Sequence, residues 1–117
     1  MRIVPHTNKI RGNNYTKVAD CSFDLNDYSG ELRRVKVLSY LDSGATSYDI
    51  EVFDRDNNVQ LVETNFTNTS GEVQEQATGV ISSPPSSKTV LEVNVKKTGG
   101  NGSHYARISE IVFYFAE

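Results

Sequence analysis

Apolar and polar residues alternate with a period of two along much of the chain, which is the pattern of a β-strand that buries one face. The clearest example is the segment 88–97, in which Leu91, Val93 and Val95 alternate with polar residues. No segment repeats apolar residues at helical spacing over three turns. The pattern therefore predicts an all-β protein.

A β-hairpin is predicted where two alternating segments flank the polar residues Asp54 to Asn58. These residues tolerate a left-handed backbone, so we expect the tip of the hairpin at Asp56 to Asn58. Asp54 and Asp56 also resemble part of a calcium loop, but the glycine and the distant glutamate of an EF-hand are absent. A polar hairpin tip explains both residues, and we predict no metal site.

Further strands are predicted at 31–41, from Cys21 to Leu25, at 72–81 and at 104–115. We expect the strand at 31–41 to form a meander with the two strands of the hairpin. In the last strand the apolar parity shifts between Ile108 and Ile111, which predicts either a β-bulge near Ser109 and Glu110 or burial of both faces of the strand. The predicted core comprises Ile50, Val52, Leu91, Val93, Val95, Ile111 and Phe113.

Turn residues separate these strands at intervals typical of an antiparallel sandwich. We therefore predict a single-domain, jelly-roll-like β-sandwich at residues 16–117, preceded by an N-terminal arm at residues 1–15. The apolar residues of the arm are Ile3, Val4 and Ile10, and we expect them to contact a partner. Tyr15 and Tyr28 lie in turn-like contexts, so their rings are predicted to be exposed to a ligand or a neighbouring subunit.

Composition narrows the class of function. The 117 residues include 12 basic and 15 acidic residues of mixed order, so we expect no binding to nucleic acid. Cys21 is the only cysteine, and His6 and His104 lie far apart in the sequence, so we predict no catalytic residues and no cofactor. The N-terminal segment lacks the apolar stretch of a signal peptide, and no apolar run is long enough to cross a bilayer. We therefore expect a chain that is made in a cytoplasm and does not enter a membrane.

One short motif points to an enzyme. Asp42-Ser43-Gly44-Ala45 resembles the catalytic loop of retroviral-type aspartic proteases, in which two aspartates of a homodimer share a proton and activate water. That family also carries two aliphatic residues and a glycine near a C-terminal helix, and the segment 109–117 has neither the glycine nor the helix. Asp-Ser-Gly is also good turn chemistry between two strands. We therefore expect Asp42 to be a turn residue and the protein not to be an enzyme.

From residue 46 onward the chain resembles small jelly-roll domains in tail, fibre and capsid-associated proteins of tailed phages. The resemblance is carried by the segments 46–54, 64–69, 91–97 and 106–109. It implies a non-enzymatic structural protein of the virion, such as a capsid decoration or tail component.

The expected partners follow from this resemblance. They are further copies of the chain in a trimer or ring, together with virion proteins such as the major capsid protein. Deletion of residues 1–12 is expected to abolish assembly and to leave the sandwich folded. The alternative function is a recognition module that binds a glycan or receptor on the host surface, and the second alternative is the aspartic protease.

Overall fold

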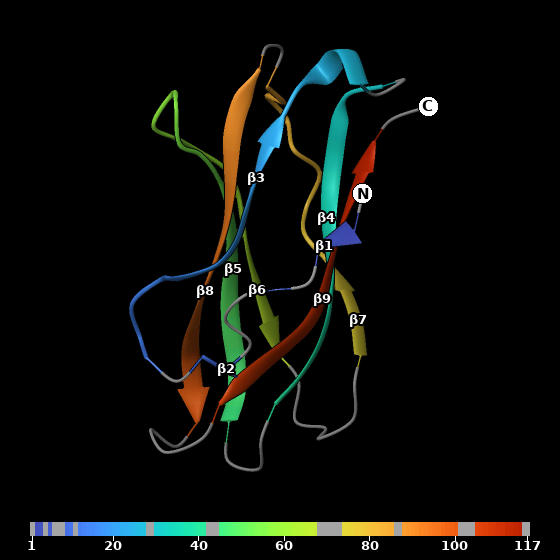
Figure 1. Ribbon diagram of the computed structural model, residues 1–117. Coiled ribbons are helices and arrows are strands. Elements are labelled where there is room, and N and C mark those ends of the chain that lie inside the picture. The colour runs from blue at the N-terminus through green and yellow to red at the C-terminus, as the bar shows by residue number, and fades with distance from the viewer. Residues whose placement is uncertain are drawn as a thin grey trace.

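The alternating segments of the sequence form the strands of two β-sheets (Figure 1). The computed structural model describes residues 2–3, 5, 9–10, 12–27, 30–41, 45–67, 74–85, 88–100 and 105–115. Its strands are β1 (Arg2–Ile3), β2 (Lys9–Ile10), β3 (Thr16–Phe23), β4 (Leu32–Leu41), β5 (Ala45–Asp54), β6 (Val59–Thr67), β7 (Gln74–Ala77), β8 (Thr89–Gly100) and β9 (Ala106–Phe115). A single 3-10 turn, η1 (Leu25–Asp27), follows β3. No helix in these ranges is long and apolar enough to cross a membrane.

The strands form two antiparallel sheets that pack face to face (Figure 1). In the β4 sheet the order is β1-β9-β4-β7, with β2 also paired to β9, and in the β8 sheet it is β3-β8-β5-β6. Strands from the first half of the chain pair with strands from the second half in a nested way, β3 with β8, β4 with β7, and β1 and β2 with β9. This nesting around the β5–β6 hairpin is the connectivity of a jelly roll. The predicted fold class is therefore confirmed.

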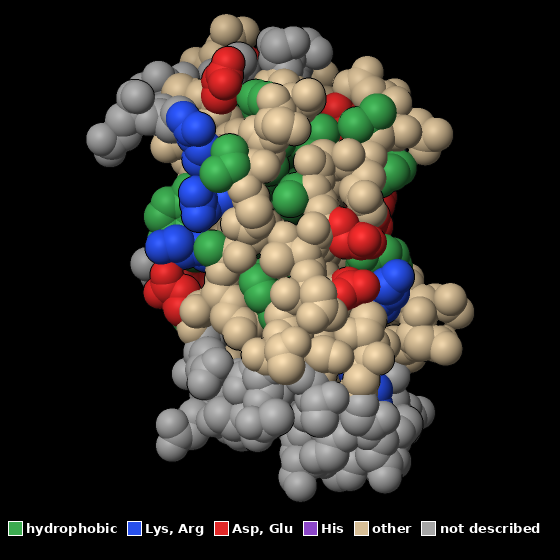
Figure 2. Space-filling model, turned by 180° about the vertical axis from the view of Figure 1, so that it is seen from behind, with side chains coloured by type: hydrophobic (Ala, Val, Ile, Leu, Met, Phe, Trp, Pro, Cys, Tyr) green, Lys and Arg blue, Asp and Glu red, His purple; other side chains and the backbone are tan. Residues whose placement is uncertain are grey.

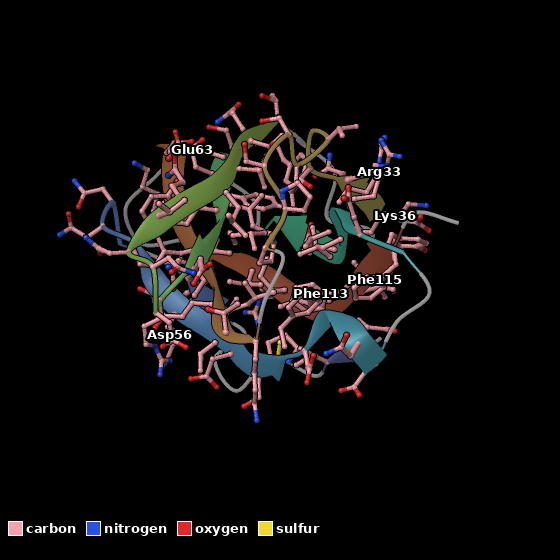
Figure 3. All side chains as sticks on the ribbon, turned by 90° about the horizontal axis from the view of Figure 1, so that it is seen from above. Arg33, Lys36, Asp56, Glu63, Phe113 and Phe115 are labelled. Atoms are coloured by element: carbon pink, nitrogen blue, oxygen red, sulfur yellow. The ribbon has the colours of Figure 1, made fainter. Side chains whose placement is uncertain are left out.

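The core lies between the two sheets and contains the inward-facing residues of the alternating segments. All seven predicted core residues are buried, and each is at most 2% exposed. Figure 3 shows Phe113 between the sheets. Burial of these side chains supplies the main favourable free energy of folding, because apolar surface is removed from water.

The predicted bulge in the last strand is present at Ser109. Leu38 of β4 pairs with Glu110, whereas the next residue of β4 pairs with Ile108, so Ser109 has no partner in the register. The extra residue reverses the parity of the strand, and as a result both Ile108 and Ile111 point into the core.

The predicted meander is wrong, because β4 and β5 belong to different sheets. β4 pairs with β7 and β9, whereas β5 pairs with β6 and β8. Alternation shows that a strand buries one face, but it does not show which strand lies beside it. The predicted β5–β6 hairpin is confirmed.

Two predicted strands have other bounds than expected: one is shorter, and the other, β3, begins earlier and ends at Phe23. The strand predicted at 72–81 is β7, and its chain then continues irregularly beside β4, where Thr78 N donates to Val35 O at 2.8 Å and Ile81 N donates to Arg33 O at 2.8 Å. Leu25, predicted to end a strand, lies in η1.

The N-terminal segment contributes two short strands to the β4 sheet instead of lying outside the strand pattern. Ile3 pairs with Ile111, and Ile10 pairs with Ala106. The side chain of Ile10 is 1% exposed, and Ile3 packs against the core. Ile10 is therefore buried within its own sandwich and does not offer its side chain to a partner. A role of this segment in contacts between copies stays a prediction.

A buried hydrogen-bond network joins the two sheets across the core. Tyr48 of β5 forms hydrogen bonds with Ser39 of β4 and, at 3.2 Å, with Gln76 Oε1 of β7. Burial raises the pKa of Tyr48, so its hydroxyl stays protonated. The ring of Tyr48 also meets that of Phe66 edge to face, with centroids 5.3 Å apart. These contacts fix how the sheets sit on one another and hence the shape of both outer faces.

Candidate functional site

Of the five residues that the sequence singled out for binding, the structure describes Ile3, Ile10 and Tyr15. Tyr15 lies on the outer face of the β8 sheet, half-exposed, whereas Ile3 and Ile10 belong to the β4 sheet. Val4 and Tyr28 lie outside the described residues. Tyr15 is therefore the member of this set around which a site can be built.

The ring of Tyr15 is held across three strands of the β8 sheet. Its hydroxyl donates a hydrogen bond to the carboxylate of Glu63 on β6, and the ammonium of Lys96 on β8 lies 4.5 Å from the ring centroid. The backbone just before Tyr15 is also held against β8, because Lys97 N donates a hydrogen bond to Gly12 O at 3.0 Å. Partial burial and then the bond to Glu63 raise the pKa of Tyr15, so the hydroxyl remains a donor at neutral pH.

Two rows of polar side chains run across the sheet beside this ring. One row pairs Asn94, Glu51 and Glu63 across β8, β5 and β6, and the other row pairs Lys96, Asp49 and Asn65 across the same strands. We call this surface the Tyr15 face, and it comprises Tyr15, Asp49, Glu51, Gln60, Glu63, Asn65, Asn94 and Lys96.

The polar groups of the Tyr15 face fix one another. Glu51 accepts hydrogen bonds from Asn94 Nδ2 at 2.7 Å and from Gln60 Nε2 at 2.8 Å. Asn65 Nδ2 donates to Asp49 Oδ1 at 2.7 Å. Glu51 and Asn94 are only 9% and 8% exposed although they face outward. Their orientations are therefore set before any ligand arrives, which lowers the entropic cost of binding.

Alternation alone predicts that these outward residues are solvated positions of half-buried strands. Each of the three strands, however, carries two polar side chains two residues apart, Asp49 and Glu51 on β5, for example. Paired polar residues at the same spacing on several strands are the signal that could have found the face. Their juxtaposition depends on the register of three strands, which the sequence alone does not show.

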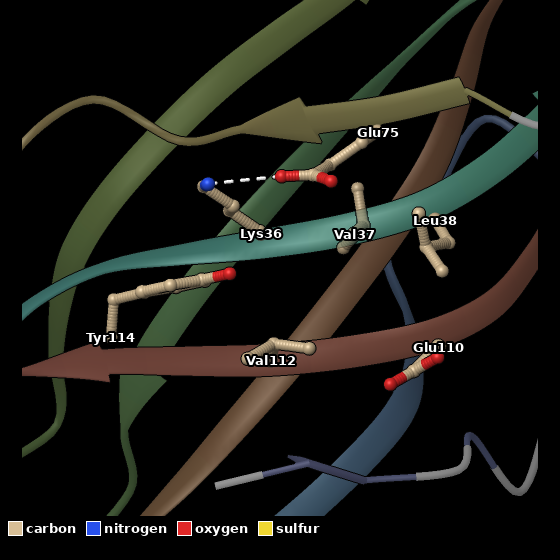
Figure 4. Close-up of a pocket in the computed structure, with 7 residues that line it drawn as sticks. All are labelled: Lys36, Val37, Leu38, Glu75, Glu110, Val112 and Tyr114. Atoms are coloured by element: carbon tan, nitrogen blue, oxygen red, sulfur yellow. Dashed lines mark ion pairs between the residues drawn. The ribbon is translucent and has the colours of Figure 1, made fainter.

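A hollow lies on the opposite side of the sandwich from the Tyr15 face, on the outer face of the β4 sheet (Figure 4). We call it the Tyr114 depression. Its volume is about 90 Å³, and it is lined by Lys36, Val37, Leu38, Glu75, Glu110, Val112 and Tyr114. The ammonium of Lys36 lies 4.5 Å from the ring centroid of Tyr114 and 2.9 Å from Glu75 Oε1. The hydrogen bond to Glu75 raises the pKa of Lys36, so this side chain stays charged.

The polar residues of the β5–β6 hairpin stabilise the turn. Asp54 is 3% exposed and accepts hydrogen bonds from Asn57 N at 3.2 Å and from Asn57 Nδ2 at 2.8 Å, and Thr89 donates a further one. Asn58 adopts the left-handed backbone, with φ of 55°. The interpretation of Asp54 and Asp56 as parts of a hairpin is thus confirmed, since the turn itself occupies the carboxylate of Asp54.

Replacing Asp54 with asparagine is expected to lower the free energy of unfolding at neutral pH by about 1.5–3 kcal/mol, the usual contribution of hydrogen bonds to a charged group. Burial alone would raise the pKa of Asp54, but the hydrogen bonds from Thr89 and Asn57 outweigh burial and hold it below its usual range. The hydrogen bonds of ionised Asp54 therefore contribute fully to the free energy of unfolding above pH of about 4. This contribution is lost as the pH falls and Asp54 becomes protonated.

Urea unfolding of the wild-type protein and of Asp54→Asn at several pH values tests this expectation. The exposed neighbour provides the control, because Asp56→Asn should change stability by less than about 0.5 kcal/mol. The role given to the charge of Asp54 would be contradicted if the free energies of unfolding of the wild type and Asp54→Asn differed by the same amount at pH about 3 and at pH about 7.

Three of the residues considered for chemistry, Asp42, His6 and His104, lie outside the described residues. Cys21 is half-buried, and burial raises the pKa of its thiol to about 11, which disfavours the reactive thiolate. Within these ranges no group of three or more His, Cys, Asp or Glu side chains is placed to hold a metal ion.

Comparison with known proteins shows a shared fold. No family model matches the sequence, and no curated protein matches it. A solved structure of the carbohydrate-binding module CBM36 in complex with calcium and xylotriose superposes with a TM-score of 0.57 and 16% identity, covering 97% of this chain and 99% of that one. The CBM36-1 domain of a multidomain xylanase from the hindgut metagenome of Trinervitermes trinervoides has a TM-score of 0.60 and 14% identity, over 93% and 77% of the two chains.

A third similar structure is that of a larger enzyme, of which only a part matches this chain. It is a glycoside hydrolase family 43 arabinoxylan arabinofuranohydrolase from Bacillus subtilis in complex with cellotetraose, with a TM-score of 0.62 and 18% identity. The match covers 93% of this chain but 21% of the hydrolase. At these identities the three likenesses show that the chain has the β-sandwich fold of these modules.

Proposed function

We propose that this chain is a non-catalytic carbohydrate-binding module that holds a neutral, hydroxyl-rich glycan on the Tyr15 face. The observation that carries the proposal is the ring of Tyr15, which Glu63 and Lys96 fix beside two ordered rows of polar side chains. The fold supports it, because two of the similar structures are carbohydrate-binding modules, one of them bound to xylotriose.

The chemistry of the Tyr15 face suits a sugar. A pyranose ring offers an apolar face of C–H groups and a rim of hydroxyls that both donate and accept hydrogen bonds. Lys96 lies over the Tyr15 ring, and the exposed part of this half-buried ring is the surface on which the C–H groups would stack. Carboxylates accept from hydroxyls, and amides such as that of Asn94 both donate and accept, so both kinds of group fit the hydroxyl rim.

The charge of the face selects among glycans. The Tyr15 face carries the carboxylates of Asp49, Glu51 and Glu63 and the single ammonium of Lys96. An anionic sugar would face net negative charge at short range, whereas a neutral sugar would not. We therefore propose neutral oligosaccharides such as xylotriose as ligands.

Calcium has no part in this proposal. The CBM36 structure holds calcium together with xylotriose, but the residues described in this chain contain no group placed to hold a metal ion. Binding to the Tyr15 face is accordingly expected to be equal with calcium and with a chelator.

The virion role stays a prediction from the sequence, and none of the three similar structures is a virion protein. The homo-oligomer and the aspartic protease likewise stay predictions from the sequence.

An open surface with one aromatic ring binds a short glycan weakly, with a dissociation constant on the order of 0.1–1 mM. Several copies on one particle or one polymer would raise this affinity through avidity.

Replacing Tyr15 with alanine is expected to weaken binding of xylotriose about tenfold or more, because the stacking surface is lost. Tyr15→Phe keeps the ring but loses the hydrogen bond to Glu63, so a smaller loss of about threefold is expected. Isothermal titration calorimetry with xylotriose, with and without calcium, measures both.

Thr16→Ala is the matched control, since Thr16 is the exposed neighbour of Tyr15, and its affinity should equal that of the wild type. Thermal melting of each variant shows that the sandwich remains folded. The proposal fails if the wild-type protein binds no neutral oligosaccharide, or if Tyr15→Ala binds xylotriose with both the stoichiometry and the affinity of the wild type.

A further inference from the structure

We infer that the Tyr114 depression is a second glycan-binding site, so that one chain binds two glycan strands on opposite sides of the sandwich. The inference goes beyond the proposed function, and rests on it only for the class of ligand. It is carried by the repetition of one arrangement of side chains on the two outer faces.

On each outer face, the ammonium of a lysine lies over a tyrosine ring and beside a carboxylate. On the Tyr114 depression, Lys36 lies 4.5 Å from the ring centroid of Tyr114 and 2.9 Å from Glu75. On the Tyr15 face, Lys96 lies 4.5 Å from the ring centroid of Tyr15 and 3.8 Å from Asp49. In both places the charged lysine contacts one ring face and is itself held by an acid, which immobilises the aromatic ring.

The position of the Tyr114 depression leaves it open to a polymer. β9 and β4 are the inner strands of their sheet, and Tyr114 and Val112 of β9 pair with Arg34 and Lys36 of β4. Tyr114 is 40% exposed, one of only three large hydrophobic side chains so exposed among the described residues. Figure 2 shows the molecule from behind, with hydrophobic side chains in small separate groups, most Lys and Arg side chains along one margin and others near the opposite one.

The size and lining of the depression match one sugar unit on a surface. Pockets that enclose small molecules measure about 300–1,000 Å³, and the depression of about 90 Å³ is far smaller. Val112 and Leu38 supply apolar contacts for C–H groups, and Glu75 and Glu110 supply acceptors for hydroxyls (Figure 4). An exposed polymer that touches the hollow with one residue satisfies this geometry, whereas an enclosed small molecule does not.

The two sites face away from each other. Figure 3, which looks down the sandwich, shows Glu63 and Lys36 on opposite outer sides. A short oligosaccharide on one face does not reach the other, because the two packed sheets lie between them. One chain therefore binds two short glycans and cross-links long ones.

Titration calorimetry and cross-linking of a soluble neutral xylan test the inference. Wild-type protein is expected to bind two xylotriose molecules per chain and to make a xylan solution turbid. Tyr114→Ala and Tyr15→Ala should each bind one molecule and leave the solution clear, and the double variant should bind none. Because Tyr114 is exposed, its replacement should leave the melting temperature unchanged.

Lys36→Gln is the second variant, since it removes the charge that holds the Tyr114 ring and keeps a polar side chain that is only one atom shorter. It should weaken the second site about threefold or more and leave the first site unchanged. If Tyr114→Ala has the stoichiometry of the wild type while Tyr15→Ala loses binding, the second site is wrong and the proposed function stands. If the wild type binds no glycan, both are wrong. Sedimentation of each variant ensures that turbidity does not arise from contacts between copies.

Discussion

Replacing Phe113 with alanine is expected to lower the free energy of unfolding by about 3–5 kcal/mol, the largest effect of any single change considered for this protein. Phe113 is 2% exposed and belongs to the core between the two sheets. Its loss leaves a cavity that the surrounding strands of both sheets can fill only partly, because protein interiors are closely packed. Urea unfolding followed by circular dichroism measures the change.

Val80→Ala is the control for this measurement. Val80 is 48% exposed, so the same kind of truncation at the surface should change stability by less than about 0.5 kcal/mol. A loss below about 1 kcal/mol for Phe113→Ala would mean that the sandwich core does not lie where the structure places it.

Replacing Ile10 with alanine is expected to cost about 2–5 kcal/mol, although the residue lies in a segment with no strand pattern in the sequence. Ile10 is 1% exposed and belongs to the same core as Phe113. Deletion of residues 1–12 removes this side chain together with β1 and β2, so it should destabilise the sandwich. The earlier expectation, that the deletion leaves the sandwich intact, is therefore reversed.

Asn13→Ala, at an exposed position of the same segment, is the matched control and should be close to neutral. Thermal melting compares the two variants and the deletion. If Ile10→Ala and the deletion melt at the temperature of the wild type, the segment is an arm after all, and its burial in the structure is wrong.

The strands and the bulge could be predicted because their signals are local. Leu91, Val93 and Val95 show their buried face through simple alternation, and the change of parity between Ile108 and Ile111 identifies the extra residue at Ser109. Such patterns follow from the two-residue period of a strand, which needs no knowledge of its neighbours.

Pairing between strands could not be predicted, because it depends on contacts far apart in the sequence. The meander of β4 and β5 is the example, since consecutive strands of a sandwich often cross between sheets. β1 and β2 have two residues each, which is too short to show any period. Ile10 is consequently buried without a sequence signal.

Of the residues that form the Tyr15 face, only Tyr15 was predicted from the sequence to bind a ligand or partner. Tyr15 was identified from its turn-like context, but its partners Glu63 and Lys96 lie 48 and 81 positions further along the chain. They meet only because β6 and β8 flank β5 in one sheet. Tyr114 was predicted only as part of the last strand, and the bulge at Ser109 sets the parity that turns its ring outward.

The central claim, glycan binding by the Tyr15 face, is tested most directly by nuclear magnetic resonance of the isotope-labelled chain during titration with xylotriose. The side-chain amides of Gln60, Asn65 and Asn94 lie on this face and give separate signals. We predict that these signals and the backbone signal of Tyr15 shift as the glycan is added, in the presence of calcium or of a chelator, and that they do not shift in Tyr15→Ala. Signals on the Tyr15 face that stay unchanged while xylotriose and other neutral oligosaccharides are added to saturation would contradict the claim.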